Sequence, residues 1–284
     1  PSLFLSYELG NSQDLQLNVT RRLRRPWGGQ LNSFKNKRDA SIINYGNPEL
    51  NPEYTWAFEV NYLKNWQMHT LSLSAYYRPT TDVMQRINYQ SSADGMMYAS
   101  WFNVAKSQST GLEIIGKDRF GKWLDLTTTV NLYYYKLDAF SYDIDGQTVT
   151  GDATEKFTWN ARMIANFILP WDLTIQAIGN LNSRQATAQG YTRSNYGVSL
   201  GLRKNLFEKK LVLAVNCRDL LDSRKRTSVS YGTGFERHQE MRWGSRNVMF
   251  TVTWNFGNMK QKKPQRDDNG EEQMDMMDSY NGAM

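Results

Sequence analysis

Apolar and polar residues alternate along most of this chain with a period of two. The clearest case is segment 246–257, in which every second position is apolar: Val248, Phe250, Val252, Trp254 and Phe256. A period of two is typical of a β-strand whose two faces meet different surroundings. Strands of about ten residues with one apolar face are the unit of a transmembrane β-barrel, in which one face meets lipid and the other a watery lumen.

The same alternation predicts eleven strands, at residues 2–9, 13–23, 53–64, 69–90, 97–117, 123–140, 155–168, 173–188, 194–207, 210–231 and 236–257. They indicate an all-β fold, an antiparallel up-and-down transmembrane β-barrel. In the third strand the apolar face, which we expect to meet lipid, carries Trp56, Phe58, Val60 and Tyr62. We expect Glu59 and Asn61 to face the lumen, because a carboxylate in hydrocarbon is costly.

The composition agrees with a barrel and leaves one alternative. The mean hydropathy is -0.65, and no apolar run approaches the roughly 20 residues that a transmembrane helix needs. The 16 Tyr and 9 Trp residues would supply the aromatic girdles of a barrel. The alternative is a soluble all-β protein whose aromatic residues fill a core. The single cysteine, Cys217, excludes an internal disulfide framework and falls on an apolar face.

The connections between the predicted strands differ in length. Four are tight turns, at 10–13, 119–122, 169–172 and 207–210, whereas longer loops occupy 24–52, 140–154 and 188–195. Short periplasmic turns and long extracellular loops are characteristic of outer-membrane barrels. The two strands that flank residues 91–96 exceed the length that crosses a bilayer, so about half of each should project outside.

The side of the membrane on which the tight turns lie determines where an eleven-stranded chain begins and ends. If the tight turns are periplasmic, the last of eleven strands ends in the periplasm and the first begins outside. Bacterial single-chain barrels have an even number of strands. We therefore expect upstream sequence to be missing, and we expect residues 1–257 to be unable to close a barrel alone. Residues 258–284 lack the period of two and form a polar tail, which we expect to be a flexible, solvated periplasmic extension, with a docking peptide as the alternative.

Two motifs carry a family resemblance. Residues 46–53, GNPELNPE, resemble a segment found in the barrels of TonB-dependent receptors. Residues 25–34 are similar to the RPxxxxLNPF run of the Bacteroidetes-type outer membrane protein β-barrel family, with Ser33 where proline is usual. Further matches lie at 187–190, 201–204, 215–225 and 243–257.

The resemblance implies the C-terminal half of a 22-stranded barrel in the outer membrane of a Gram-negative cell. Its partners would be outer-membrane lipid and lipopolysaccharide, the N-terminal barrel half and plug that this chain lacks, and a TonB-type energy-transducing protein bound through the missing segment. The implied function is uptake of an unidentified extracellular ligand. The alternative is a non-transporting outer-membrane barrel with a structural, secretion or adhesion role.

The residues do not favour an enzyme. His69 sits at a short turn and His238 is expected in a loop, and neither has a second His or Cys at metal-ligand spacing. Residues 232–234, Gly-Thr-Gly, read as a hairpin turn rather than a phosphate loop, because no helix pattern follows them. We therefore expect no catalytic residues, metal or cofactor.

Basic residues give the candidate ligand site. The chain carries a net charge of +6, and its arginines cluster at the end of the second strand and on the final hairpin. Three uses are open: capture of an anionic ligand, binding of lipopolysaccharide phosphates, or pairing with plug carboxylates. Nucleic acid is not an expected partner, because no compact basic face exists outside the strands. Together with the long loop 24–52, this gives the candidate ligand-binding residues Trp27, Phe34, Lys35, Lys37, Arg38, Arg224, Arg226 and Arg237.

Overall fold

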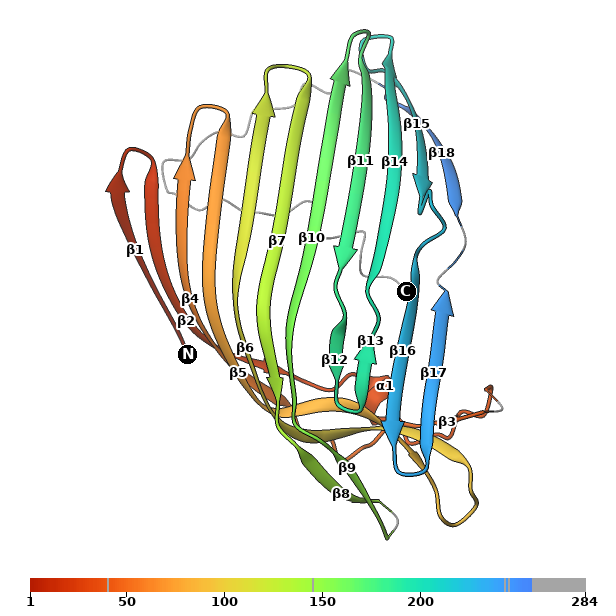
Figure 1. Ribbon diagram of the computed structural model, residues 1–284. Coiled ribbons are helices and arrows are strands. Elements are labelled where there is room, and N and C mark those ends of the chain that lie inside the picture. The colour runs from red at the N-terminus through yellow and green to blue at the C-terminus, as the bar shows by residue number, and fades with distance from the viewer. Residues whose placement is uncertain (40, 145, 243, 245, 257–284) are drawn as a thin grey trace.

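One curved antiparallel sheet forms most of the protein. The computed structural model describes residues 1–39, 41–144, 146–242, 244 and 246–256. Eleven strands follow one another along the sheet (Figure 1): β1 (Ser2–Gly10), β2 (Gln13–Arg24), β4 (Glu53–Asn65), β5 (His69–Gln90), β6 (Met97–Phe120), β7 (Leu124–Leu137), β10 (Thr154–Leu169), β11 (Leu173–Asn182), β14 (Asn195–Leu206), β15 (Leu211–Arg218) and β18 (Asn247–Trp254). The predicted all-β, up-and-down architecture of eleven successive strands is confirmed.

The sheet is open. β1 and β18 stand at its two ends, and each pairs with one neighbour in the sheet, β2 and β15 respectively. The four tight turns at 10–13, 119–122, 169–172 and 207–210 lie at one end of this sheet, which is the upper end in Figure 1, and the longer connections lie at the other. At the tight-turn end, residues such as Asn11, Trp171 and Phe207 take left-handed backbone conformations, which two-residue hairpin turns require.

The register separates an apolar face from a polar face. Phe58 pairs with Tyr77 across β4 and β5, and their rings stack at 6.2 Å. Trp56, Phe58 and Val60 are all exposed on this face. Farther along the sheet, Cys217 lies on the same apolar face, between Leu200 and Val248. The predicted alternation in β4 and the apolar position of the cysteine are therefore confirmed.

On the opposite face of the sheet, several polar side chains contact one another. Arg78 binds Glu59 at 2.6 Å, and its guanidinium lies 4.1 Å from the centre of the Tyr76 ring. The Tyr76 hydroxyl donates to Asn131 Oδ1 at 2.9 Å, and its ring covers Gly111, where a Cβ would come within 2.6 Å of the hydroxyl. In this part of the sheet the face is polar and its side chains bind one another, as suits a barrel lumen.

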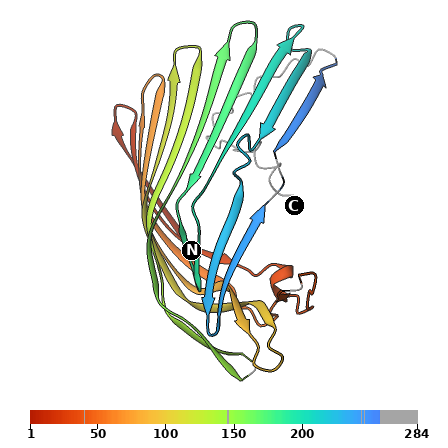
Figure 2. The ribbon, with the colours of Figure 1, turned by 45° about the vertical axis from the view of Figure 1, so that its right-hand side comes forward.

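Beyond the bilayer-length part of the sheet, β5 and β6 bend and run sideways across its lower end (Figures 1 and 2). The pairing of the two strands shifts between Thr80 and Met84, and Asp82 takes a positive φ of 57°. Such an irregularity is a β-bulge, which bends the strand that contains it. The short strand β3 (Ile43–Asn44) pairs in parallel with β6 in this bent region. β5 and β6 are 22 and 24 residues long, and they continue as this bent ribbon beyond the residues that pair with β4 and β7.

Most of the buried apolar residues pack around this ribbon. Ile87 and Leu137 are each 1% exposed, and they contact residues of a hairpin formed by β8 (Phe140–Ile144) and β9 (Gln147–Gly151). The 140–154 connection is therefore an ordered hairpin rather than an open loop. It fixes the outer half of β5 and β6 in place.

Three of the predicted long strands are interrupted, which corrects the sequence interpretation. Segment 210–231 breaks after β15 because Asp219 takes a positive φ and its carboxylate accepts hydrogen bonds from the Ser223 and Arg224 N–H groups. Segment 173–188 breaks after β11, where the Trp159 N–H donates to the Ser183 hydroxyl at 2.8 Å. Segment 236–257 contains two strands, of which the first ends at Arg242 and the second, β18, begins at Asn247.

The outer parts of these segments form a second sheet together with residues 190–192, which lie in the predicted loop 188–195. Its order is β12 (Gln185–Thr187), β13 (Gly190–Thr192), β16 (Lys225–Gly232) and β17 (Phe235–Arg242). The β16–β17 hairpin reaches toward the bent ribbon (Figure 2), and β16 contacts β5. The Gly-Thr-Gly sequence forms the turn of this hairpin, as predicted.

The described residues contain one helix, α1 (Gly28–Leu31), in the 24–52 connection. No helix in this part of the chain is long and apolar enough to cross a membrane. The tail predicted at 258–284 lies outside the described residues.

Candidate ligand-binding site

The segment with the sequence GNPELNPE fastens the preceding loop to β6. The Gly46 N–H donates to the Asn32 carbonyl at 2.7 Å, and the Asn47 amide donates to the Trp101 carbonyl at 3.1 Å. A Cβ on Gly46 would lie 2.5 Å from the Gln30 carbonyl, so only glycine fits. Pro48 lies in a turn, in which the Leu50 N–H donates to the Asn47 carbonyl at 3.4 Å and the Glu49 N–H donates to the Asn47 side chain at 2.9 Å. The motif thus holds the end of the loop rigidly above the sheet.

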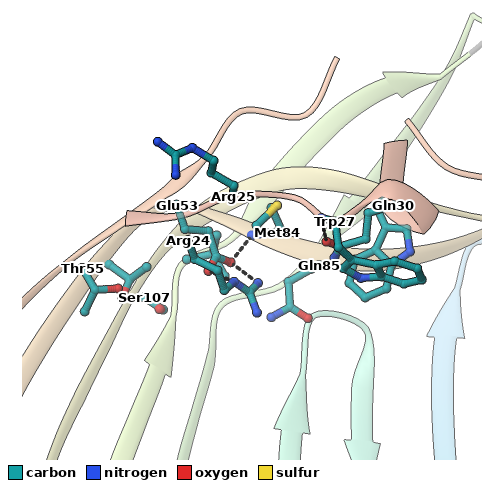
Figure 3. Close-up of a pocket in the computed structure, with 12 residues that line it drawn as sticks. Arg24, Arg25, Trp27, Gln30, Glu53, Thr55, Met84, Gln85 and Ser107 are labelled. Carbon is teal, nitrogen blue, oxygen red and sulfur yellow. Dashed lines mark hydrogen bonds and ion pairs between the residues drawn. The ribbon is translucent and has the colours of Figure 1, made fainter. Parts of the chain in front are cut away.

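The rim cleft, between this loop and the bulge in β5, has a volume of about 630 Å³. Figure 3 shows its walls. It is lined by Arg24, Arg25, Trp27, Gln30, Glu53, Thr55, Thr80, Val83, Met84, Gln85, Trp101 and Ser107.

Glu53 organises the rim cleft. Its carboxylate binds Arg24 at 2.6 Å and accepts a hydrogen bond from the Met84 N–H at 2.6 Å (Figure 3). Glu53 is 8% exposed, so both contacts compensate a charge that would be costly to bury alone. The arrangement leaves Arg25 with no carboxylate partner among the described residues.

The arginine cleft adjoins the rim cleft and shares Gln85 and Trp101 with it. Its volume is about 310 Å³. It lies between the bent ribbon and the second sheet, and it is lined by Gln85, Arg86, Asn88, Trp101, Thr187, Gln189, Arg226, Ser228, Ser230, Arg237, Gln239 and Met241. The two clefts form one continuous surface at the end opposite the tight turns.

The structure brings together some of the sequence-predicted ligand residues and separates others. Trp27 lines the rim cleft, and Arg226 and Arg237 line the arginine cleft. Lys35 lies 5.3 Å from the centre of the Tyr98 ring. The remaining candidates are exposed and line neither cleft: Phe34, Lys37, Arg38 and Arg224.

Sequence reasoning missed most of the residues that line these clefts, among them Gln85, Arg86 and Trp101. The positions of these side chains depend on the bulge in β5, which the alternation of apolar and polar residues does not predict. The signal that could have found them was the excess length of β5 and β6, which indicates that both strands continue past the barrel wall. Arg86 is the one basic residue of β5 beyond the bulge.

Two groups near the arginine cleft have shifted pKa values. Burial, together with the nearby positive charge of Arg237, lowers the pKa of Arg86. Hydrogen bonds from the Ser41 hydroxyl and N–H lower the pKa of Asp39, and Arg237 adds a smaller effect in the same direction. Arg237 is therefore within electrostatic range of both.

The described residues hold no group of three or more His, Cys, Asp and Glu side chains that could bind a metal. His238 lies within β17 rather than in a loop, because the β16–β17 hairpin continues in register as far as Lys225 and Arg242. Its ring contacts Glu236 at 2.9 Å. His69 binds Asp118 at 2.8 Å at the tight-turn end, far from both clefts along the sheet.

A sequence comparison decides the family. The profile of the "Outer membrane protein beta-barrel family" matches residues 1–254. The chain belongs to this family. The apolar face of the barrel wall accordingly meets the lipid of the outer membrane. No protein with a curated description matches the chain significantly in sequence.

Similar solved structures share the fold of this barrel wall. The ferric yersiniabactin uptake receptor FyuA from Yersinia pestis is 15% identical, with a TM-score of 0.57 over 90% of this chain and 37% of its own. The copper transporter OprC is 11% identical, with a TM-score of 0.59 over 90% and 39%. The siderophore receptor PiuA from Acinetobacter baumannii is 13% identical, with a TM-score of 0.59 over 89% and 35%. The chain thus spans less than two fifths of each.

Proposed function

We propose that this chain is part of the barrel of a TonB-dependent outer-membrane transporter that takes up an extracellular ligand. The observation that carries the proposal is the continuous surface of the rim and arginine clefts at the end of the sheet opposite the tight turns. Short turns face the periplasm in outer-membrane barrels, so this surface faces the medium. The names of the similar structures, an uptake receptor, a transporter and a siderophore receptor, support the same class.

The polar face of the sheet supports a further part of the proposal. A row of polar residues crosses the wall from β6 to β14, each paired with the next: Glu113, Asn131, Asn160, Asn182 and Asn195. A row of amide groups suits hydrogen bonding to another protein segment or to water. We assign it to contact with the plug of the intact receptor, whose energised movement by a TonB-type partner opens the lumen. The motifs at 25–34 and 46–53 favour the Bacteroidetes-type subgroup.

Loop 24–52 is assigned to ligand contact rather than to simple connection. Its end is held rigidly by Gly46 and Asn47, whereas Phe34 is 76% exposed. A rigid base with an exposed aromatic tip is suited to capture at the mouth of a transporter. The other candidate residues of this loop, Lys35, Lys37 and Arg38, add positive charge at the same place.

The test compares what cells remove from their medium. Isogenic strains with the intact receptor, with its gene deleted, and with the TonB-type partner deleted are grown in one medium, and its small molecules are quantified by mass spectrometry. The proposal predicts at least one compound that only the first strain depletes. Identical depletion by all three strains, with normal receptor abundance in the first, would favour a structural, secretion or adhesion barrel instead.

A further inference from the structure

Three arginines from distant parts of the sequence converge on the arginine cleft. Arg86 comes from the bent part of β5, and Arg226 and Arg237 come from β16 and β17. The register of the hairpin places the last two on one face, because Arg226 pairs with Met241 and Arg237 pairs with Ser230, and all four line the cleft. The contact of β16 with β5 brings this face against Arg86.

None of the three arginines forms an ion pair with a described residue. Arg86 donates to the side-chain oxygen of Asn44, Arg226 donates to the Thr192 hydroxyl at 3.5 Å, and Arg237 donates to the Gln239 side chain at 3.3 Å. By contrast, other arginines of the same chain bind carboxylates: Arg24, Arg78, Arg119 and Arg242.

The lining of the cleft adds no negative charge. It contains three arginines and not one Asp or Glu. Arg237 also lines a neighbouring pocket together with Asp39, Glu236 and Glu240, and these three acidic residues lie outside the lining of the arginine cleft. Like charges held together in a partly buried cleft repel each other, and burial already lowers the pKa of Arg86. An anion in the cleft would relieve that repulsion.

The rest of the lining suits an organic ligand rather than a bare ion. Gln85, Gln189 and Gln239 offer amide groups, Ser228 and Ser230 offer hydroxyls, and Trp101 offers an aromatic surface. Ligand clefts commonly have volumes of about 300 to 1,000 Å³, so this one holds a small molecule or one part of a larger molecule. Arginine matches carboxylate and phosphate oxygens with two parallel N–H donors.

We infer that the arginine cleft binds a small organic polyanion through carboxylate or phosphate groups held by Arg86, Arg226 and Arg237. The inference rests on the proposed function and gives the class of the transported ligand. Amides and hydroxyls of the lining contact the uncharged part of the molecule. The adjoining rim cleft accommodates any part that the arginine cleft does not hold.

The test is isothermal titration calorimetry on the full-length receptor, purified in detergent at low salt. The probes are citrate and inorganic pyrophosphate, with trimethyl citrate as the uncharged match. The variants are R86Q, R226Q and R237Q, and R193Q is the matched control because Arg193 is exposed and lies outside both clefts. Each variant keeps a hydrogen-bonding side chain, and heat-dependent mobility on gels confirms that the barrel is folded.

At least one charged probe is expected to bind, and trimethyl citrate is not. Each cleft variant should weaken binding roughly 10- to 100-fold, the effect of losing a hydrogen bond to a charged group, while R193Q binds as the wild type does. Absence of binding by both probes would overturn the inference and assign the arginines to carboxylates elsewhere in the receptor or to lipopolysaccharide. Equal binding by R193Q and the cleft variants would also overturn it. Neither result affects the depletion test of transport.

Discussion

The side-chain amide of Gln189 makes two hydrogen bonds to the backbone of Asn88. The Asn88 N–H donates to Oε1 at 2.7 Å, and Nε2 donates to the Asn88 carbonyl at 2.9 Å. The amide therefore forms the two hydrogen bonds that a residue of a neighbouring strand would form with this edge of β5. Both residues are under 9% exposed, so the pair ties the β12–β13 turn to the bent ribbon and sets the width of the arginine cleft.

Replacing Gln189 by leucine should loosen this junction. The buried N–H and carbonyl of Asn88 would lose their partners, at a cost of about 1–3 kcal/mol each. Hydrogen exchange measured by mass spectrometry should therefore quicken in the peptide that contains residues 84–90. The matched control is Gln185→Leu, because Gln185 lies in β12 without a side-chain hydrogen bond to a described residue. Unchanged exchange in the Gln189 variant would mean that other contacts hold the junction.

Gly46→Ala should free loop 24–52 from the sheet. An alanine Cβ at this position would meet backbone atoms of residues 30 and 32 at 2.5 to 2.7 Å, so the loop must shift. Gly28→Ala is the matched control in the same loop, since no atom lies within 4 Å of its Cβ position. Limited trypsin digestion of the folded receptor should cut the loop faster in the first variant alone. Equal cutting rates in both would show that Gly46 is not a point of attachment.

A charged side chain on the lipid-facing side of the wall should lower its stability more than a charged side chain at the next position, which faces the lumen. Val60 lies on the apolar face of β4, and Asn61 lies on the polar face, between Gln16 and Ser74. An arginine facing lipid costs about 2–4 kcal/mol near the bilayer midplane and less toward its edges. Urea unfolding of the receptor in phospholipid bilayers should show this loss for Val60→Arg and a smaller loss for Asn61→Arg. The reverse order would invert the register of the wall.

The sequence was sufficient to predict the wall of the barrel, because each strand is an alternation that local residues encode. Tyr62 pairs with Leu73, which pairs with Ile114, so apolar residues of neighbouring strands lie side by side on one face. The same alternation therefore identifies each strand of the wall. The interruptions were not predictable in this way. The break at Asp219 depends on a carboxylate that caps two N–H groups, and the alternation of apolar residues continues past it.

The candidate site was predictable only in part. Arg226 and Arg237 were found because the final hairpin is rich in arginine, and Trp27 was found because its loop is long. Arg86 was not found, because it is a single basic residue in a long strand and its position depends on the bulge at Thr80–Met84. Arg224 resembles its neighbour Arg226 in sequence, yet it belongs to the turn that Asp219 forms and stays outside the cleft.

The most direct test of the account is the side of the membrane that the clefts face. Single cysteines are placed at Thr233, in the β16–β17 turn, and at Lys209, in a tight turn, with Cys217 replaced by alanine. Intact cells are treated with a membrane-impermeant maleimide and then compared with permeabilised cells. We predict that position 233 is labelled in intact cells and that position 209 is labelled only after permeabilisation. Labelling of position 209 but not 233 in intact cells would place both clefts in the periplasm and contradict an uptake site there.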